Sequence, residues 1–287
     1  MASIIETGLR DAFKEPPMSV ARTIRIGAVS YLNSKPLIEG LDGATPNAEL
    51  ILDYPSCLAD QLADGQLDVA LIPSIEYFRN PGHEVVSNGC VATHGAVLSV
   101  KMYSRVHPGD VKTLALDAGS RTSAALVQII LNEKYGVKPK LVPLSMEQTT
   151  ADTDADAILL IGDRAMHQPD ETFVETWDLG EEWLNWTGLP FVFAMWVVRS
   201  EFDGRDIEQA LCDARDRGIA SLEPIAFREA AALGIDEAAA FEYLYNNLHF
   251  KLGSAERLGL KLFYELAAKQ GLVPEGVDLV FRDYART

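Results

Sequence analysis

Continuous apolar runs alternate with segments of helical spacing in the first part of the chain. The runs at 24–29, 48–54 and 67–73 are apolar enough for buried strands. Between the last two, "SCLADQLADG" at 56–65 has the spacing of a short helix that ends at Gly65. A strand, a helix and a continuously apolar strand are typical of a parallel βαβ unit, so we predict a parallel sheet here.

A second set with the same pattern follows. Apolar positions at Ala124, Val127, Ile130 and Leu131 predict a helix, and strands are predicted at 112–117, 139–144 and 156–162. "DVALIPS" and "DAILLIGD" occupy the same place in the two sets, although no repeat is detectable residue by residue. We therefore predict an α/β protein with two similarly built lobes.

Two apolar segments, at 94–104 and 191–200, flank the second set. Their strands, at 95–103 and 191–198, are expected to be hinge strands between the lobes. Such a geometry places a ligand cleft where the carboxyl ends of the strands meet. Helical spacing then predicts helices at about 206–220, 224–233, 236–248 and 254–270. The expected organisation is a flexible N-terminal extension at 1–22, lobe one at 23–108 plus 190–287, and lobe two at 109–189.

Charge and cysteine content narrow the class of protein. The net charge of −17 argues against a nucleic-acid partner or an acidic membrane surface, so an anionic ligand must be held by a local pocket. The three cysteines form no CxxC pattern, which favours reduced thiols. The N-terminus has no apolar signal segment, and no apolar run approaches the roughly 18 residues of a membrane helix. We expect a cytoplasmic protein, monomeric or homodimeric.

Polar clusters follow the predicted strands, where ligands bind in open α/β sheets. The most informative is "GSRTS", in which Ser120 or Thr122 is placed to cap a helix beside Arg121. Unsatisfied first-turn N–H groups and a cation make such a place suitable for an anion. A plain helix cap with a solvated arginine is an equally good interpretation of the spacing alone.

The cluster "SYLNSK" after the first strand can likewise be interpreted either as a ligand-binding group or as a capped turn. It contains Ser30, Asn33, Ser34 and Lys35, and Pro36 follows where a helix could begin. Asn33 both donates and accepts hydrogen bonds without titrating, which suits a hydroxyl or carboxylate ligand. The density of polar groups favours a binding role over a simple capped turn.

Templates for nucleotide, metal or serine-hydrolase chemistry do not occur in the sequence. Cys90 and His94 lie four residues apart without further ligands nearby, so a metal-free interpretation is favoured. His249 is expected at a helix end, and Trp183, Trp186 and Phe191 in core or hinge packing. We therefore predict no cofactor and no metal, and the residues alone leave a binding protein and an enzyme equally open.

Five segments, in order, resemble the chorismate dehydratase family of the futalosine route to menaquinone. They are "RIGAVSYLNSKPL", "LADGQLDVALIPSIEYFRNPG", "LALDAGSRTSAAL", "ADAILLIGDRAM" and "WTGLPFVFAMWV". The resemblance implies a periplasmic-binding-protein type II fold used as a cytoplasmic enzyme. It implies loss of water from the dianion chorismate to give 3-[(1-carboxyvinyl)oxy]benzoate, without a cofactor and with the substrate's own enolpyruvyl carboxylate as base.

The resemblance also suggests roles for individual residues. Asn33 would be catalytic, orienting the leaving hydroxyl or the side-chain carboxylate. Asp163 is a weaker candidate, because a carboxylate repels a dianion, and an ion pair with Arg164 or a capped turn is a slightly better interpretation of it. The predicted substrate-binding residues are Ser30, Ser34, Ser74, Ser99, Ser120, Arg121, Thr122, Ser123 and Asp163.

Two alternatives remain. A 1,4-dihydroxy-6-naphthoate synthase-like enzyme of the same pathway would have a different Ser-, Cys- and Pro-containing first loop and a cleft histidine, and "SYLNS" speaks against it. A small-anion solute-binding or sensing protein would be expected to carry a signal peptide or a fused DNA-binding domain, and neither pattern occurs here.

Overall fold

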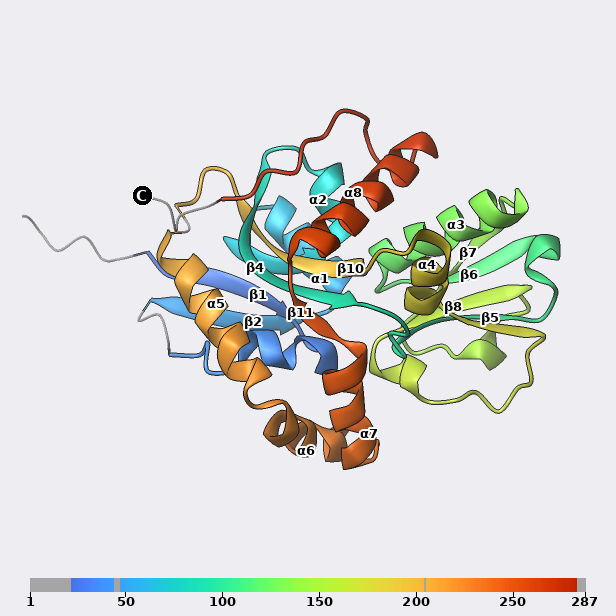
Figure 1. Ribbon diagram of the computed structural model, residues 1–287, viewed down its shortest axis with the longest axis horizontal. Coiled ribbons are helices and arrows are strands. Elements are labelled where there is room, and N and C mark those ends of the chain that lie inside the picture. Colours follow the sequence, from blue (N-terminus) through green and yellow to red (C-terminus); the bar gives the residue numbers. More distant parts are fainter. Residues whose placement is uncertain (1–21, 44–46, 204, 283–287) are drawn as a thin grey trace, which may run out of the picture.

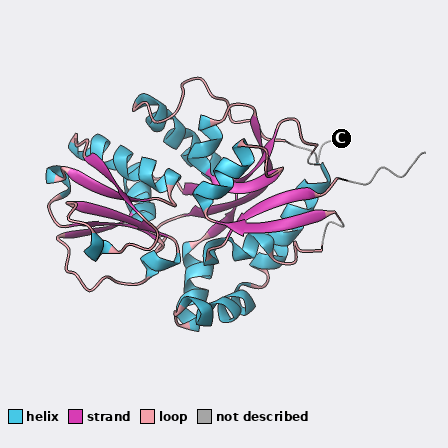
Figure 2. Cartoon of the chain, turned by 180° about the vertical axis from the view of Figure 1, so that it is seen from behind, coloured by secondary structure: helices cyan, strands magenta, loops and turns pink. Residues whose placement is uncertain are grey.

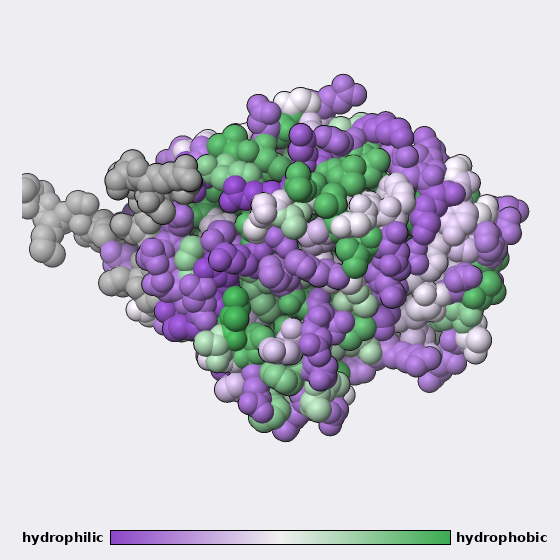
Figure 3. Space-filling model, viewed as in Figure 1, coloured by the Kyte–Doolittle hydropathy of each residue, from purple (hydrophilic) through white to green (hydrophobic). Residues whose placement is uncertain are grey.

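The computed structural model describes residues 22–43, 47–203 and 205–282 and forms two lobes, each a β-sheet with helices on its faces (Figures 1 and 2). The extension predicted at 1–22 lies outside these residues, except for Arg22. No described helix has both the length and the apolar character that crossing a membrane requires. Hydrophilic residues cover much of the face in Figure 3, with apolar residues in separate patches.

The sheet of lobe one has the strand order β11-β4-β10-β3-β1-β2. β1 pairs in parallel with β2 and β3, whereas β10 runs antiparallel to β3 and β4. All of β3 is buried, as its unbroken apolar sequence predicts. The strands are β1 (Ile24–Val29), β2 (Ala48–Asp53), β3 (Val69–Pro73), β4 (His83–Thr93), β10 (Phe191–Arg199) and β11 (His249–Lys251).

The sheet of lobe two has the order β7-β6-β8-β5-β9 and repeats this plan. In each lobe three parallel strands, β2-β1-β3 or β7-β6-β8, are followed by an antiparallel strand. In lobe one this antiparallel strand is β10, which follows the return of the chain from lobe two. In lobe two it is β5, the first strand after the chain enters that lobe. The strands are β5 (Val100–Ser104), β6 (Thr113–Asp117), β7 (Lys140–Leu144), β8 (Ala157–Ile161) and β9 (Glu175–Asp178).

Helices cover both faces of the first sheet. α5 packs on β4, and α1, α2 and α8 contact β10. The helix predicted at 236–248 is interrupted, because α7 passes into a π-helical turn, Tyr243–Asn247. The helices are α1 (Pro55–Ala63), α2 (Ser74–Arg79), α3 (Arg121–Tyr135), α4 (Leu179–Thr187), α5 (Arg205–Ile219), α6 (Leu222–Leu233), α7 (Glu237–Glu242) and α8 (Ser254–Lys269), with a 3₁₀ helix η1 (Leu32–Ile38) after β1 and another, η4 (Asp163–Met166), after β8.

The strand predicted at 94–104 was wrongly placed in lobe one. Only Val100–Ser104 is a strand, and it pairs with β8 and β9 in the second sheet. The segment 94–99 is an irregular crossing, and β4 before it was missed because its sequence mixes polar residues and glycine with apolar ones. The other limits of the predicted lobes, 23–108 with 190–287 and 109–189, stay predictions.

The first crossing is held by one carboxylate. Asp178, at the end of β9, accepts hydrogen bonds from the N–H groups of Val97 and Leu98, at 2.8 and 2.6 Å. It also caps α4 by accepting from Gly180 and Glu181, at 3.0 and 3.2 Å. Leu98 has a φ of +59°, which is unfavourable for a side chain with a Cβ, so the clamp stabilises a strained turn.

We predict that Asp178→Ala destabilises the fold by about 3 kcal/mol or more, because a helix cap is lost and partly buried N–H groups lose their acceptor. Denaturant unfolding would measure this. Asp152→Ala is the control, since exposed Asp152 also accepts a backbone hydrogen bond, from Thr149, and its loss should cost much less. Equal losses in the two variants would contradict the clamp.

Candidate active site between the lobes

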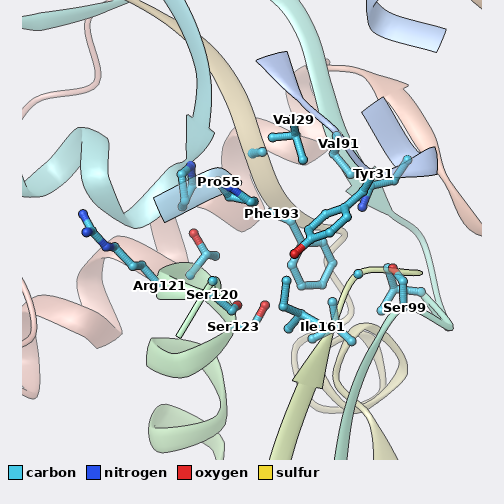
Figure 4. Close-up of a pocket in the computed structure, with 18 residues that line it drawn as sticks. Val29, Tyr31, Pro55, Val91, Ser99, Ser120, Arg121, Ser123, Ile161 and Phe193 are labelled. Carbon is cyan, nitrogen blue, oxygen red and sulfur yellow. The ribbon is translucent and has the colours of Figure 1, made fainter. Parts of the chain in front are cut away.

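A pocket lies between the lobes (Figure 4), and it encloses about 530 Å³ of space that includes open solvent. Lobe one and lobe two both contribute to its walls, and the first crossing supplies part of its floor. The lining residues are Val29, Tyr31, Asn33, Pro55, Pro73, Val91, Val97, Ser99, Val100, Gly119, Ser120, Arg121, Thr122, Ser123, Ile161, Gly162, Phe193 and Ala194.

The loop after β1 owes its shape to a buried hydroxyl. Ser34 donates to the carbonyl oxygens of Val29 and Tyr31, which closes the turn into η1. This turn brings Tyr31 and Asn33 to the pocket. Ser34 itself is fully buried and does not line the pocket. The polar cluster at the end of the first strand is therefore partly structural and partly a pocket wall.

Tyr31 lies against Gly162, so the β1 loop of lobe one touches the β8 loop of lobe two. A Cβ at Gly162 would come within 2.7 Å of Tyr31 Cζ, and its φ of +72° also favours glycine. In Figure 4 the Tyr31 hydroxyl points into the pocket, toward the side of Ser120 and Ser123. Burial raises the pKa of Tyr31, so the hydroxyl stays protonated and can donate a hydrogen bond.

Asp163 joins the lobes beside this contact. Its carboxylate accepts from the Leu32 N–H, with N–O distances of 3.1 and 3.4 Å, and it does not line the pocket. The ion pair considered between Asp163 and Arg164 does not form, because Arg164 binds Asp117 through Nε at 3.1 Å. Burial raises the pKa of Asp163 to about 6.

The N-terminus of α3 forms the wall opposite Tyr31. Ser120 occupies the N-cap position, as predicted, but its side chain makes no capping hydrogen bond. The first-turn N–H groups therefore lack a side-chain acceptor, and a helix N-terminus in that state favours an anion. Ser120 and Ser123 place hydroxyl groups beside it (Figure 4).

Thr122 connects this helix to lobe one. Its Oγ1 accepts from the Ile75 N–H at 3.2 Å and lies 3.4 Å from Ser74 Oγ. Ser74 donates to the Val192 carbonyl at 2.8 Å, is buried, and does not line the pocket. Ser74 thus ties α2 to β10, and Thr122 ties α3 to α2.

Arg121 lines the pocket but turns its guanidinium group away from Tyr31 and Ser99 (Figure 4). It pairs with Asp60 at 2.7 Å and with Glu76 at 3.2 Å, both on helices of lobe one. Its charge is therefore already balanced by carboxylates. Arg121 bridges the lobes as well as bordering the pocket.

Tyr243 lies next to the pocket residue Ser99 and is not among the site residues predicted from the sequence. Its buried hydroxyl donates to Ser99 Oγ at 2.7 Å and lies near the Asn33 side chain. Burial raises its pKa, which keeps the hydroxyl protonated. Tyr243 begins the π-helical turn, and no pattern in the sequence marks that interruption of a helix.

Six of the ten predicted site residues line the pocket: Asn33, Ser99, Ser120, Arg121, Thr122 and Ser123. The other four, Ser30, Ser34, Ser74 and Asp163, lie beside it. Ser34 and Ser74 bond to backbone carbonyls, Asp163 accepts from Leu32, and the Ser30 N–H donates to the Asp53 carbonyl at 3.1 Å. These four residues hydrogen-bond within the protein at or near the ends of strands. The binding roles of all ten residues stay predictions.

Residues 24–269 match the protein family described as menaquinone biosynthesis. The chain belongs to this family. It is also similar to a chorismate dehydratase of Thermus thermophilus, with 31% identity over 260 residues, covering 84% of this chain and 93% of the relative. The predicted family resemblance is therefore confirmed.

Two solved structures share the fold of this member of the menaquinone biosynthesis family. Protein AF1704 from Archaeoglobus fulgidus matches with a TM-score of 0.69 and 16% identity, covering 89% of this chain and all of that one. The alkanesulfonate-binding protein SsuA from Xanthomonas axonopodis pv. citri matches with a TM-score of 0.62 and 15% identity, covering 89% and 95%. The predicted two-lobed binding-protein fold is confirmed.

We predict that Asp163→Asn changes how stability depends on pH. The folded protein holds the Asp163 proton more tightly than the unfolded chain does, so stability falls as pH rises from about 4 to about 6. The variant should lack this fall and gain up to about 3 kcal/mol relative to wild type between those pH values. Denaturant unfolding across that range would measure the difference, with exposed Asp42→Asn as control. Parallel profiles for Asp163→Asn and wild type would contradict the raised pKa.

Proposed function

We propose that the protein is a cytoplasmic hydro-lyase that removes water from chorismate to give 3-[(1-carboxyvinyl)oxy]benzoate, in the futalosine route to menaquinone. Family membership and the named relative support the reaction. The observation that carries it in the structure is the pocket, where the Asn33 loop faces the uncapped N-terminus of α3. A small dianion would lie between these two walls.

Substrate binding would depend on dipoles more than on free charges. Among the described lining residues, the cation is Arg121, and two carboxylates already pair with it. One substrate carboxylate would take the α3 N–H groups with the hydroxyls of Ser120 and Ser123. Such preorganised donors stabilise charge that spreads onto the ring carboxylate during the reaction.

The leaving hydroxyl would lie near Asn33. Tyr243 donates to Ser99 and lies near Asn33, so it would help to position the Asn33 amide. Loss of the ring hydrogen and the neighbouring hydroxyl gives an aromatic ring, and aromatisation supplies the driving force. The family resemblance implies that the substrate's own enolpyruvyl carboxylate is the base, and we propose the same here. The described lining, which contains no histidine, aspartate, glutamate or lysine, agrees with this.

Incubation of the purified protein with chorismate, followed by chromatography with mass detection, tests the reaction. We expect a product lighter by one water with an aromatic ultraviolet spectrum. Unchanged chorismate from a folded protein that chorismate stabilises would instead support a small-anion binding protein, a role suggested by the fold shared with SsuA. If chorismate is neither converted nor stabilises the protein, chorismate is ruled out as the ligand.

We predict that Asn33→Ala lowers kcat by about 10²- to 10³-fold, the usual effect of removing one preorganised donor. The fold should survive, because Asn33 borders a cavity and its neighbour Ser34 closes the turn. Steady-state kinetics on chorismate would measure the change. Asn185→Ala, at an exposed position of α4, is the control and should keep full activity. Full activity in Asn33→Ala would remove Asn33 from the mechanism.

We predict that Arg121→Ala raises KM for chorismate by about tenfold with a smaller effect on kcat. Arg121 is the cation that borders the pocket, so its loss removes a positive charge close to the bound dianion. Arg79→Ala is the matched control, because Arg79 pairs with Glu76 at 2.7 Å but does not line this pocket. An unchanged KM in Arg121→Ala, or an equal rise in Arg79→Ala, would contradict this role.

A further inference from the structure

Two histidines and a glutamate meet at the lobe-one end of the first crossing. His94 follows β4, His249 begins β11, and Glu256 lies in the first turn of α8. One ligand atom from each lies within 4.8 Å of the other two. His94 Nε2 is 2.5 Å from Glu256 Oε1, and His249 Nε2 is 3.7 Å from the same oxygen.

The carboxylate is fixed and the imidazoles are reachable. Glu256 is 3% exposed, and its Oε2 accepts from the Gly253 N–H at 2.9 Å, which leaves Oε1 for the two rings. The side chains of His94 and His249 are 52% and 43% exposed, with ring centroids 4.4 Å apart. An ion could therefore enter from solvent without unfolding the site.

We propose that His94, His249 and Glu256 form a binding site for one transition-metal dication of the Zn²⁺ class. Two imidazole nitrogens and a carboxylate oxygen are a donor set that Zn²⁺ accepts, with water in the fourth position. The ion takes the place of the proton shared by His94 and Glu256, and that proton is released to solvent. This site is separate from the pocket between the lobes and does not depend on the proposed reaction.

Charge around the cluster favours a cation on balance. Glu256 supplies a negative charge next to the two neutral imidazole ligands, and the chain carries −17 overall, which raises the local concentration of cations. Lys251, on the same strand as His249, opposes this. Cys90, the partner considered for His94 in the sequence, is fully buried and does not belong to the cluster.

A bound ion would link segments at the lobe-one end of the first crossing. His94 is the first residue after β4, so a bound ion would join the start of the crossing to β11 and α8. α8 also touches the second crossing, the segment 188–190 between α4 and β10, because a Cβ at Gly259 would lie 2.0 Å from the Pro190 carbonyl oxygen. The ion would therefore restrain the base of both connections between the lobes.

The test is a titration of the tag-free, full-length protein with Co²⁺ after treatment with a chelator. A tag must be absent because it would add histidines, and all five native histidines lie among the described residues. We expect saturable visible absorption bands of nitrogen- and oxygen-bound Co²⁺ at one ion per chain, removed by Zn²⁺ in competition. Thermal unfolding of the wild type should shift upward with added Zn²⁺.

His94→Gln and His249→Gln should each weaken Zn²⁺ binding by more than about 100-fold, beyond the effect of losing an outer-shell partner. Circular dichroism would check that these partly exposed substitutions leave the fold intact. His107→Gln, at an exposed histidine of lobe two, is the matched control and should bind like the wild type. Absence of saturable binding in the wild type, or binding as tight as that of the wild type in His94→Gln and His249→Gln, would overturn the proposal.

Discussion

The relation between the two lobes depends on the carboxylate of Asp178. It accepts four backbone N–H groups, two from the irregular crossing before β5 and two from the start of α4. The crossing passes through a strained Leu98 and ends at Ser99, a wall of the pocket. An interaction between β9 and this crossing therefore fixes where a pocket residue lies, although Asp178 itself does not line the pocket.

Ion pairs beside the pocket hold its surroundings together, and neutral donors are the groups that we propose for recognition. Arg121 pairs with carboxylates of lobe one, and Arg164 pairs with Asp117. Apart from apolar side chains, the lining offers hydroxyls, an amide and the start of α3, whose N-cap side chain makes no capping hydrogen bond. In a protein with a charge of −17, such local dipoles would let the proposed anion bind against the overall field without burying an unpaired cation.

Contacts between the lobes also surround the pocket. Tyr31 lies on Gly162, Leu32 donates to Asp163, and Thr122 accepts from Ile75. Each contact joins a segment that follows a strand of one lobe to a segment of the other. The first crossing begins at His94, in the proposed metal cluster, and ends at Ser99, in the pocket wall. The first crossing therefore runs from the proposed cation site to the proposed ligand pocket.

The repeated strand–helix pattern determined the α/β class, the parallel strands and the strand ends that carry Asn33 and Ser120, because buried strands and helix starts are local properties of sequence. Tertiary structure alone decided that β5 pairs in lobe two, since polar residues and glycine hide β4 and blur the crossing. It also decided that Arg121 turns to Asp60 and Glu76, and that Tyr243 meets Asn33 and Ser99. His94, His249 and Glu256 are likewise brought together from distant parts of the sequence. Such meetings depend on the packing of distant segments, which no local pattern encodes.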